Sequence, residues 1–127
     1  MSFDLSLKRP ACDYCGRERD SVWSRSGITH NVNSIVDLCI GSDVVARDAR
    51  AGYAERSWGR LFGWPASEAL PIVVRALDVA NDTAREAEFR ALEPENGWGS
   101  LEGVRDAFAD LARACAEHPK AIFEAWG

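Results

Sequence analysis

The sequence lacks most features that mark the common classes of enzyme and membrane protein. No apolar run approaches the ~20 residues that a membrane-spanning helix requires, and the N-terminal segment has no signal-peptide core. Histidine occurs only twice, so candidates for a general base are few. The Walker A loop, the G-x-S-x-G elbow and the H-E-x-x-H zinc motif are all missing. We therefore expect a cytoplasmic protein with no membrane partner that is not an enzyme.

Lysine is also scarce, and acidic residues outnumber basic ones. Only Lys8 and Lys120 are lysines, so the other thirteen of the 15 basic residues are arginines. The formal charge of -5 and the pI near 5.0 disfavour a nucleic-acid partner, because proteins that coat nucleic acids are basic. Guanidinium groups suit carboxylates and phosphates, although GC-rich coding produces the same arginine bias.

Alternating side chains predict strands near both ends of the chain. Residues 3–8 place three apolar side chains on one face and polar ones on the other, which is typical of a half-buried strand. Residues 21–28 predict a second strand, paired with the first in a long hairpin. Residues 120–126 predict a short closing strand.

Helices are predicted between these strands. Asn31 or Asn33 would cap a short helix that Gly41 closes. Segment 43–64 has no clean period, and we expect one or two short helices there. Three further helices are predicted. The first follows a Ser67 cap and extends to about residue 80, the second covers residues 83–92, and the third covers residues 101–117 after a Ser100 cap. The expected buried stripe of the first of these consists of Leu70, Val73, Val74, Leu77 and Ala80.

The length of 127 residues corresponds to one ordinary domain, so we expect a single domain over residues 1–127. The element order predicts an α+β fold. A small antiparallel sheet, made of two N-terminal strands plus a C-terminal strand, should pack on three to five helices.

A Cys-x-x-Cys loop at residues 12–16 lies at the tip of the predicted hairpin. Cys12 and Cys15 have the spacing of a zinc knuckle, which provides half of a zinc site. His30 and Cys39 are candidates for the other ligands, as are Cys115 and His118. An exposed turn without metal and a redox pair are the alternatives, the latter less favoured because no strand leads directly into a helix there.

Two polar segments each precede a predicted helix. Thr29, His30 and Asn31 follow the second strand, and residues 96–100 (NGWGS) precede the helix that begins near residue 101. Helix starts offer free N–H groups to a polar ligand, and Trp98 could stack on a ring. The alternatives are that the first segment only caps a helix, and that the second is a tight turn with Trp98 plugging the core.

Residues 28–31 (ITHN), 89–94 (FRALEP), 96–99 (NGWG) and 115–121 (CAEHPKA) together resemble a family of small proteins from tailed phages, prophages and bacterial genomes. An actinobacterial subgroup of similar proteins carries the N-terminal Cys-x-x-Cys, whereas other members lack it. The resemblance implies a phage accessory protein that acts on the host, and it carries no enzymatic activity with it.

Two hypotheses for function follow. In the first, the protein is a non-catalytic binder that sequesters a nucleotide-like immune signal of the host, and zinc is a candidate cofactor. In the second, it inhibits a host protein through the Arg- and Trp-containing segment 43–64, because both residue types are favoured at binding hot spots. The ligand-binding residues expected under the first hypothesis are Thr29, His30, Asn31, Asn96, Gly97, Trp98 and Gly99, with Arg56 and Arg60 for a phosphate.

Overall fold

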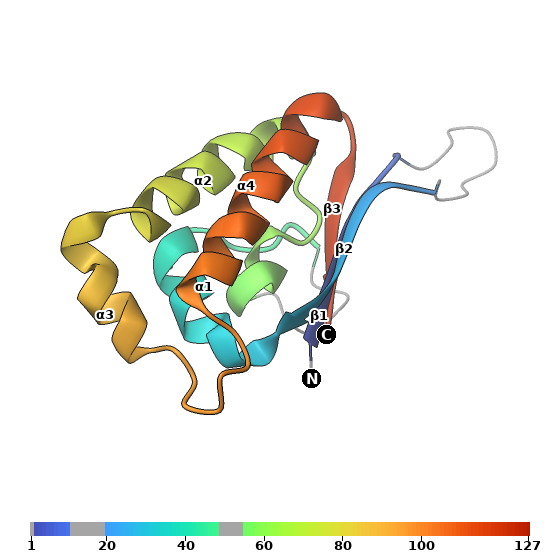
Figure 1. The fold of residues 1–127 in the computed structure, drawn as a ribbon. Coiled ribbons are helices and arrows are strands. Elements are labelled where there is room, and N and C mark those ends of the chain that lie inside the picture. The colour runs from blue at the N-terminus through green and yellow to red at the C-terminus, as the bar shows by residue number, and fades with distance from the viewer. Residues whose placement is uncertain (1, 11–19, 49–54) are drawn as a thin grey trace.

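The computed structural model describes residues 2–10, 20–48 and 55–127, and it confirms the predicted α+β fold (Figure 1). The strands are β1 (Ser2–Lys8), β2 (Ser21–Thr29) and β3 (Ile122–Trp126). The α-helices are α1 (Asn33–Ile40), α2 (Ala66–Ala80), α3 (Glu86–Ala91) and α4 (Leu101–Glu117). Short 3-10 helices cover His30–Val32, Ser57–Leu61 and Thr83–Arg85.

The three strands form one antiparallel sheet in the order β2-β1-β3, and the helices cover one of its faces (Figure 1). Phe3, Leu5 and Leu7 of the central strand are buried against the helices, as the alternating sequence predicts. The hairpin between β1 and β2 is also confirmed. The Cys-x-x-Cys loop of this hairpin lies outside the described residues.

A bulge interrupts the pairing of β2 with β1 near the end of β2. Ile28 pairs with Phe3 and Arg25 with Leu5, so two residues of β2 lie opposite Asp4 alone. One of them is Gly27, which has a φ of +77° and donates its N–H to Oδ1 of Asp4 at 3.2 Å. The bulge changes the direction of β2 just before the 3-10 helix His30–Val32, which Thr29 caps. We call Thr29 and this 3-10 helix the Thr29 turn.

Helix α2 begins at Ala66, before the predicted Ser67 cap, and its buried stripe differs in part from the predicted one. Its first N–H groups, those of Ala66 and Ser67, donate to the carbonyls of Ala121 and Pro119 at 2.7 and 2.9 Å, so the helix needs no serine cap. Val74, predicted to be buried, is 43% exposed. The prediction for Val73 and Ala80 is confirmed, and the fully buried stripe consists of Ala66, Ala69, Val73, Ala76 and Ala80.

Alanine dominates this stripe because α2 packs closely on α4. Helix α4 contributes two further buried alanines, Ala107 and Ala114, together with the predicted apolar face of Val104, Phe108 and Leu111. Small side chains shorten the distance between two helix axes, so the larger residues of α2 are displaced toward the edges of the contact.

Segment 43–64 forms one 3-10 helix within its described residues and covers the outer edge of β3. Gly63 donates its N–H to the carbonyl of Phe123 at 2.8 Å, and Phe123 donates to the carbonyl of Trp64 at 3.0 Å. The edge of β3 is therefore occupied by this segment. Residues 49–54, where part of the predicted helical structure falls, lie outside the described residues.

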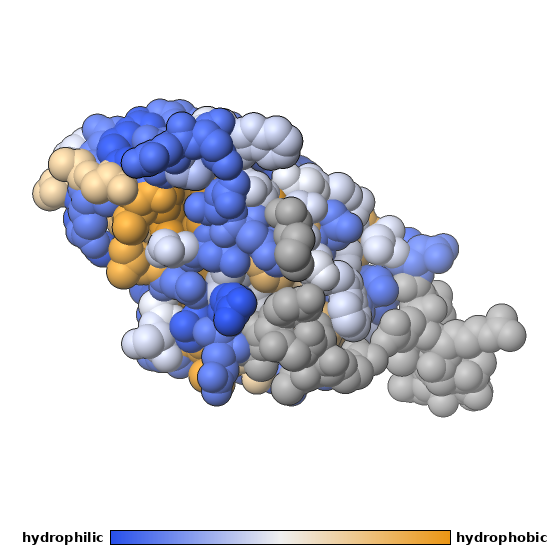
Figure 2. All heavy atoms as spheres, turned by 90° about the horizontal axis from the view of Figure 1, so that it is seen from below, coloured by the Kyte–Doolittle hydropathy of each residue, from blue (hydrophilic) through white to orange (hydrophobic). Residues whose placement is uncertain are grey.

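The surface seen from below is largely hydrophilic, with an apolar area on the side where α1 and α3 lie (Figure 2). Leu38 of α1 and Leu92, which follows α3, are 42% and 37% exposed. Among the helices that the structure describes, none is long and apolar enough to cross a membrane.

Candidate functional site

The two polar segments that precede helices meet at one groove of about 510 Å³. Residues 25–29 and Val32 form one wall, at the bulged end of β2 and the turn that follows it. Residues 97–100, with Gly103 and Val104 of α4, form the other wall. The fold thus brings Thr29, Gly97, Trp98 and Gly99 of the predicted ligand-binding residues to one place.

Direct contacts hold the two walls together. Asn31 donates from Nδ2 to the carbonyl of Trp98 at 3.3 Å, and its backbone N–H donates to Oγ1 of Thr29 at 3.2 Å. A Cβ atom added to Gly99 would lie 2.7 Å from Cγ2 of Thr29 and from Cγ1 of Val32. Glycine at this position therefore allows the loop to lie against the Thr29 turn.

The loop before α4 presents Trp98 to solvent. Asn96 accepts the N–H of Trp98 through Oδ1 at 3.0 Å, and the N–H of Gly97 donates to the carbonyl of Pro94 at 3.3 Å. Trp98 is 72% exposed, so the interpretation that it plugs the core is wrong. An exposed indole at the rim of a groove is available for stacking on a flat ring.

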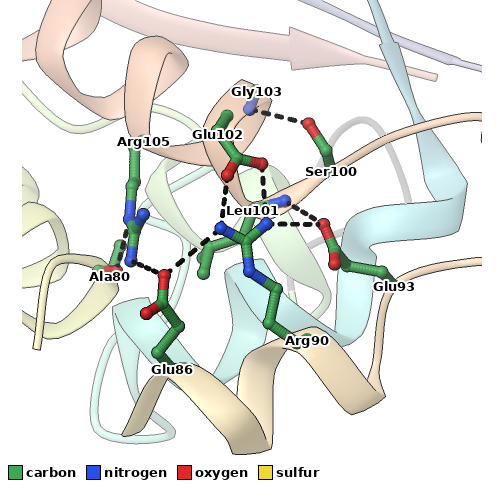
Figure 3. A network of polar contacts seen from close by, with 9 residues as sticks. All are labelled: Ala80, Glu86, Arg90, Glu93, Ser100, Leu101, Glu102, Gly103 and Arg105. Carbon is green, nitrogen blue, oxygen red and sulfur yellow. Dashed lines mark hydrogen bonds and ion pairs between the residues drawn. The ribbon is translucent and has the colours of Figure 1, made fainter. Parts of the chain in front are cut away.

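A network of charged side chains fixes this loop between α3 and α4 (Figure 3). Arg90 of α3 pairs with both carboxylate oxygens of Glu102, and also with Glu86 at 3.2 Å and Glu93 at 3.1 Å. Glu93 in turn accepts the N–H of Leu101 at 2.9 Å. The base of the loop is therefore connected to both helices through one guanidinium group.

The same contacts satisfy the start of α4. Leu101 donates its N–H to Glu93, and Gly103 donates its N–H to Oγ of Ser100 at 3.1 Å, which confirms Ser100 as the cap. Two N–H groups of the first turn are thus already bonded to side chains, and one of these side chains is a carboxylate. These two N–H groups are therefore not free to bind a ligand.

Stability should depend on the ionisation of Glu102. The hydrogen bond from Arg90 lowers the pKa of Glu102 from 4.5 to about 2. A carboxyl group whose pKa is lower in the folded state stabilises the protein above pH 4.5, and this contribution is lost as the pH falls from 4.5 toward 2. We expect the thermal midpoint of Glu102→Gln to change less across that window than the midpoint of the wild type. Glu95→Gln, which removes a carboxylate from the same loop, is the control and should retain the wild-type slope.

The remaining predicted ligand-binding residues lie outside the groove. The ring of His30 packs on Phe3 with 4.4 Å between ring centroids, and burial lowers its pKa, with the charge of Arg56 acting in the same direction. Arg60 donates from Nε to Asp37 at 3.0 Å and lies beside α1. Neither Arg56 nor Arg60 lines the groove.

Arg25, which the sequence analysis missed, is the charged side chain of the groove. It is the only charged residue among the described residues that line it. Its guanidinium donates to Oδ2 of Asp110 at 3.3 Å, and Trp23 donates from Nε1 to Oδ1 of the same carboxylate, also at 3.3 Å. Two polar contacts two residues apart on a strand indicate that this face of β2 meets α4. In the sequence, the two-residue spacing of Trp23 and Arg25 within a predicted strand was the signal that could have placed both side chains on the same face.

The structure describes four of the candidate metal ligands, namely His30, Cys39, Cys115 and His118. Cys12 and Cys15 lie outside the described residues. Cys39 is in the core at the far end of α1 from His30, and burial raises the pKa of its thiol to about 11. Burial likewise raises the pKa of Cys115 to about 11. In the described ranges 2–10, 20–48 and 55–127 no three His, Cys, Asp or Glu residues are grouped as a metal site.

Trp58 and Arg60 of segment 43–64, whose residue types are favoured at binding hot spots, make their contacts within the fold. Trp58 is fully buried and packs on Phe108, with 4.8 Å between ring centroids. Arg60 is held by Asp37 and by the carbonyl of Val44 at 3.4 Å. Alanine at Trp58 would therefore remove a core side chain, and it cannot report on a partner surface alone.

Comparison with protein-family models, with curated proteins and with solved structures gives no match for this chain. The lining residues of the groove are a single arginine, two glycine-bearing backbone segments, small hydroxyl side chains, apolar side chains and an exposed indole.

Proposed function

We propose that the protein is a non-catalytic binder of a nucleotide-like ligand. The ligand lies in the groove between the Thr29 turn and residues 96–100, which we call the Trp98 loop. The observation that carries the proposal is the convergence of two segments, 67 residues apart in sequence, on one groove with an exposed tryptophan at its rim. Clefts of this size, with few polar groups among apolar ones, are typical of small-molecule sites.

The lining residues suit a ring attached to an anionic group. Trp98 offers a flat surface for a base, and stacking of this kind does not depend on which base is bound. Glycines at 27, 97, 99 and 103 leave the walls without side chains at those positions, so backbone atoms can approach a ligand closely. Arg25 supplies positive charge at the opposite wall.

The side chains that line the groove also suit a binder that is not an enzyme. The described lining residues offer no carboxylate, imidazole, thiol or lysine amine to act as a general acid, a general base or a nucleophile. The resemblance to phage and prophage proteins favours one setting for such a binder, namely sequestration of a nucleotide-like immune signal of the host.

Native mass spectrometry of freshly purified protein, compared with the denatured mass, tests this function. We expect an adduct of nucleotide mass in the native spectrum, either copurified or formed on titration with ribonucleoside 5′-monophosphates and cyclic dinucleotides. It should disappear on denaturation and be weaker in Trp98→Ala at the same nucleotide concentration. A bare polypeptide mass throughout the titration would contradict the proposal. An adduct with the mass of one zinc ion would separately support the zinc prediction for Cys12 and Cys15.

A further inference from the structure

Polar groups on both walls of the groove can donate hydrogen bonds. Thr29 and Ser100 each accept a backbone N–H through the side-chain oxygen, which leaves the hydroxyl hydrogen of each free to donate. Arg25 adds the guanidinium donors. A set of donors around one positive charge is complementary to a phosphate or another oxyanion.

Arg25 is held by a contact that can be exchanged. Its partner Asp110 receives three donors: Arg113 at 2.6 Å, Trp23 at 3.3 Å and Arg25 itself at 3.3 Å. Arg113 thus makes the shortest of these bonds. If Arg25 turned to a ligand, Asp110 would keep Arg113 and Trp23, so no carboxylate would be left unpaired in this partly buried place.

We propose that Arg25 holds the phosphate of the ligand, and that it does so by exchanging its ion pair with Asp110 for one with the phosphate. This inference rests on the proposed function and adds to it the residue that selects a phosphorylated over an unphosphorylated ligand. Arg25 takes the role that the sequence analysis gave to Arg56 and Arg60, which lie outside the groove. Asp110 acts as a positioning residue that keeps the free arginine at the β2 wall.

The exchange predicts opposite effects for its two members. Arg25→Gln should lower the affinity for a nucleoside 5′-monophosphate about tenfold, because a charge-assisted hydrogen bond to phosphate is lost. Asp110→Asn should raise that affinity about threefold, because the competing partner of Arg25 loses its charge and the binding-competent state becomes more populated. A purely structural role of the Arg25–Asp110 pair would instead make both variants weaker binders.

Isothermal titration calorimetry with the four ribonucleoside 5′-monophosphates and the four nucleosides separates these outcomes. Arg25→Gln and Asp110→Asn should change the monophosphate affinities as stated and leave the nucleoside affinities unchanged. Arg9→Gln, which makes the same change in net charge at the far end of the hairpin, should bind like the wild type. Raising the salt concentration should weaken monophosphate binding to the wild type more than to Arg25→Gln.

Failure of the inference and failure of the proposed function give different results. If monophosphates bind, Trp98→Ala weakens them and Arg25→Gln does not, the groove is the site but Arg25 is not its phosphate contact. If Asp110→Asn weakens binding, the Arg25–Asp110 pair has a structural role and the proposed exchange is contradicted. If no monophosphate and no nucleoside binds, the proposed function fails and the role of Arg25 fails with it.

Discussion

Replacing Gly99 with alanine should destabilise the protein by about 3 kcal/mol, because the new Cβ has no space and the backbone disfavours it. Gly99 has a φ of +115°, and its Cβ would lie 2.7 Å from side-chain carbons of Thr29 and Val32. The relief of this clash requires the Trp98 loop to move away from the Thr29 turn, so the two walls of the groove would separate.

Gly97→Ala is the matched control for this prediction. Gly97 also has a positive φ, of +73°, but nothing lies within 4 Å of a Cβ placed there. Its replacement should cost about 1 kcal/mol, the strain of a left-handed residue alone. Urea denaturation of both variants gives the two free energies of unfolding. Equal losses would contradict the close approach of the two walls.

Trp98→Ala should lower the affinity for a nucleotide about 30-fold, since stacking contributes roughly 2 kcal/mol per base. The side chain is 72% exposed, so the free energy of unfolding should change by no more than about 0.5 kcal/mol. A large loss of affinity with little change in the free energy of unfolding is expected of a side chain that contacts the ligand and contributes little to the core.

Trp98→Phe is the control for this second prediction, because phenylalanine retains a ring that can stack. It should bind within about threefold of the wild type. The quenching of tryptophan fluorescence on titration with adenosine 5′-monophosphate provides the affinity of the phenylalanine variant through the other four tryptophans, and calorimetry provides it independently. A large loss of stability in Trp98→Ala, or full affinity without the indole, would oppose the role assigned to this side chain.

Elements whose signals are local could be predicted from the sequence. Helix α4 and its Ser100 cap were predicted correctly because the apolar spacing and the cap are contained in one short segment. The N-terminal hairpin was predicted from strict alternation in residues 3–8. Segments 28–31 and 96–99 were also selected from the sequence, and parts of both line the groove.

Features that depend on distant partners could not be predicted. The prediction of the buried stripe of α2 was partly wrong. Ala69 and Ala76 are buried and Val74 is exposed because α4 packs closely on α2. Arg25 was missed because its partner Asp110 is 85 residues away. Arg60 was chosen for a ligand although Asp37, on a neighbouring element, already binds it.

Mapping of backbone amide chemical shifts during titration with adenosine 5′-monophosphate tests the central claim most directly. If the groove is the ligand site, the largest shifts will fall in residues 25–29 and 97–104, on both walls, together with the Trp98 indole N–H. Shifts confined to residues 43–48 and 55–64, or to one wall only, would contradict a ligand held between the Thr29 turn and the Trp98 loop.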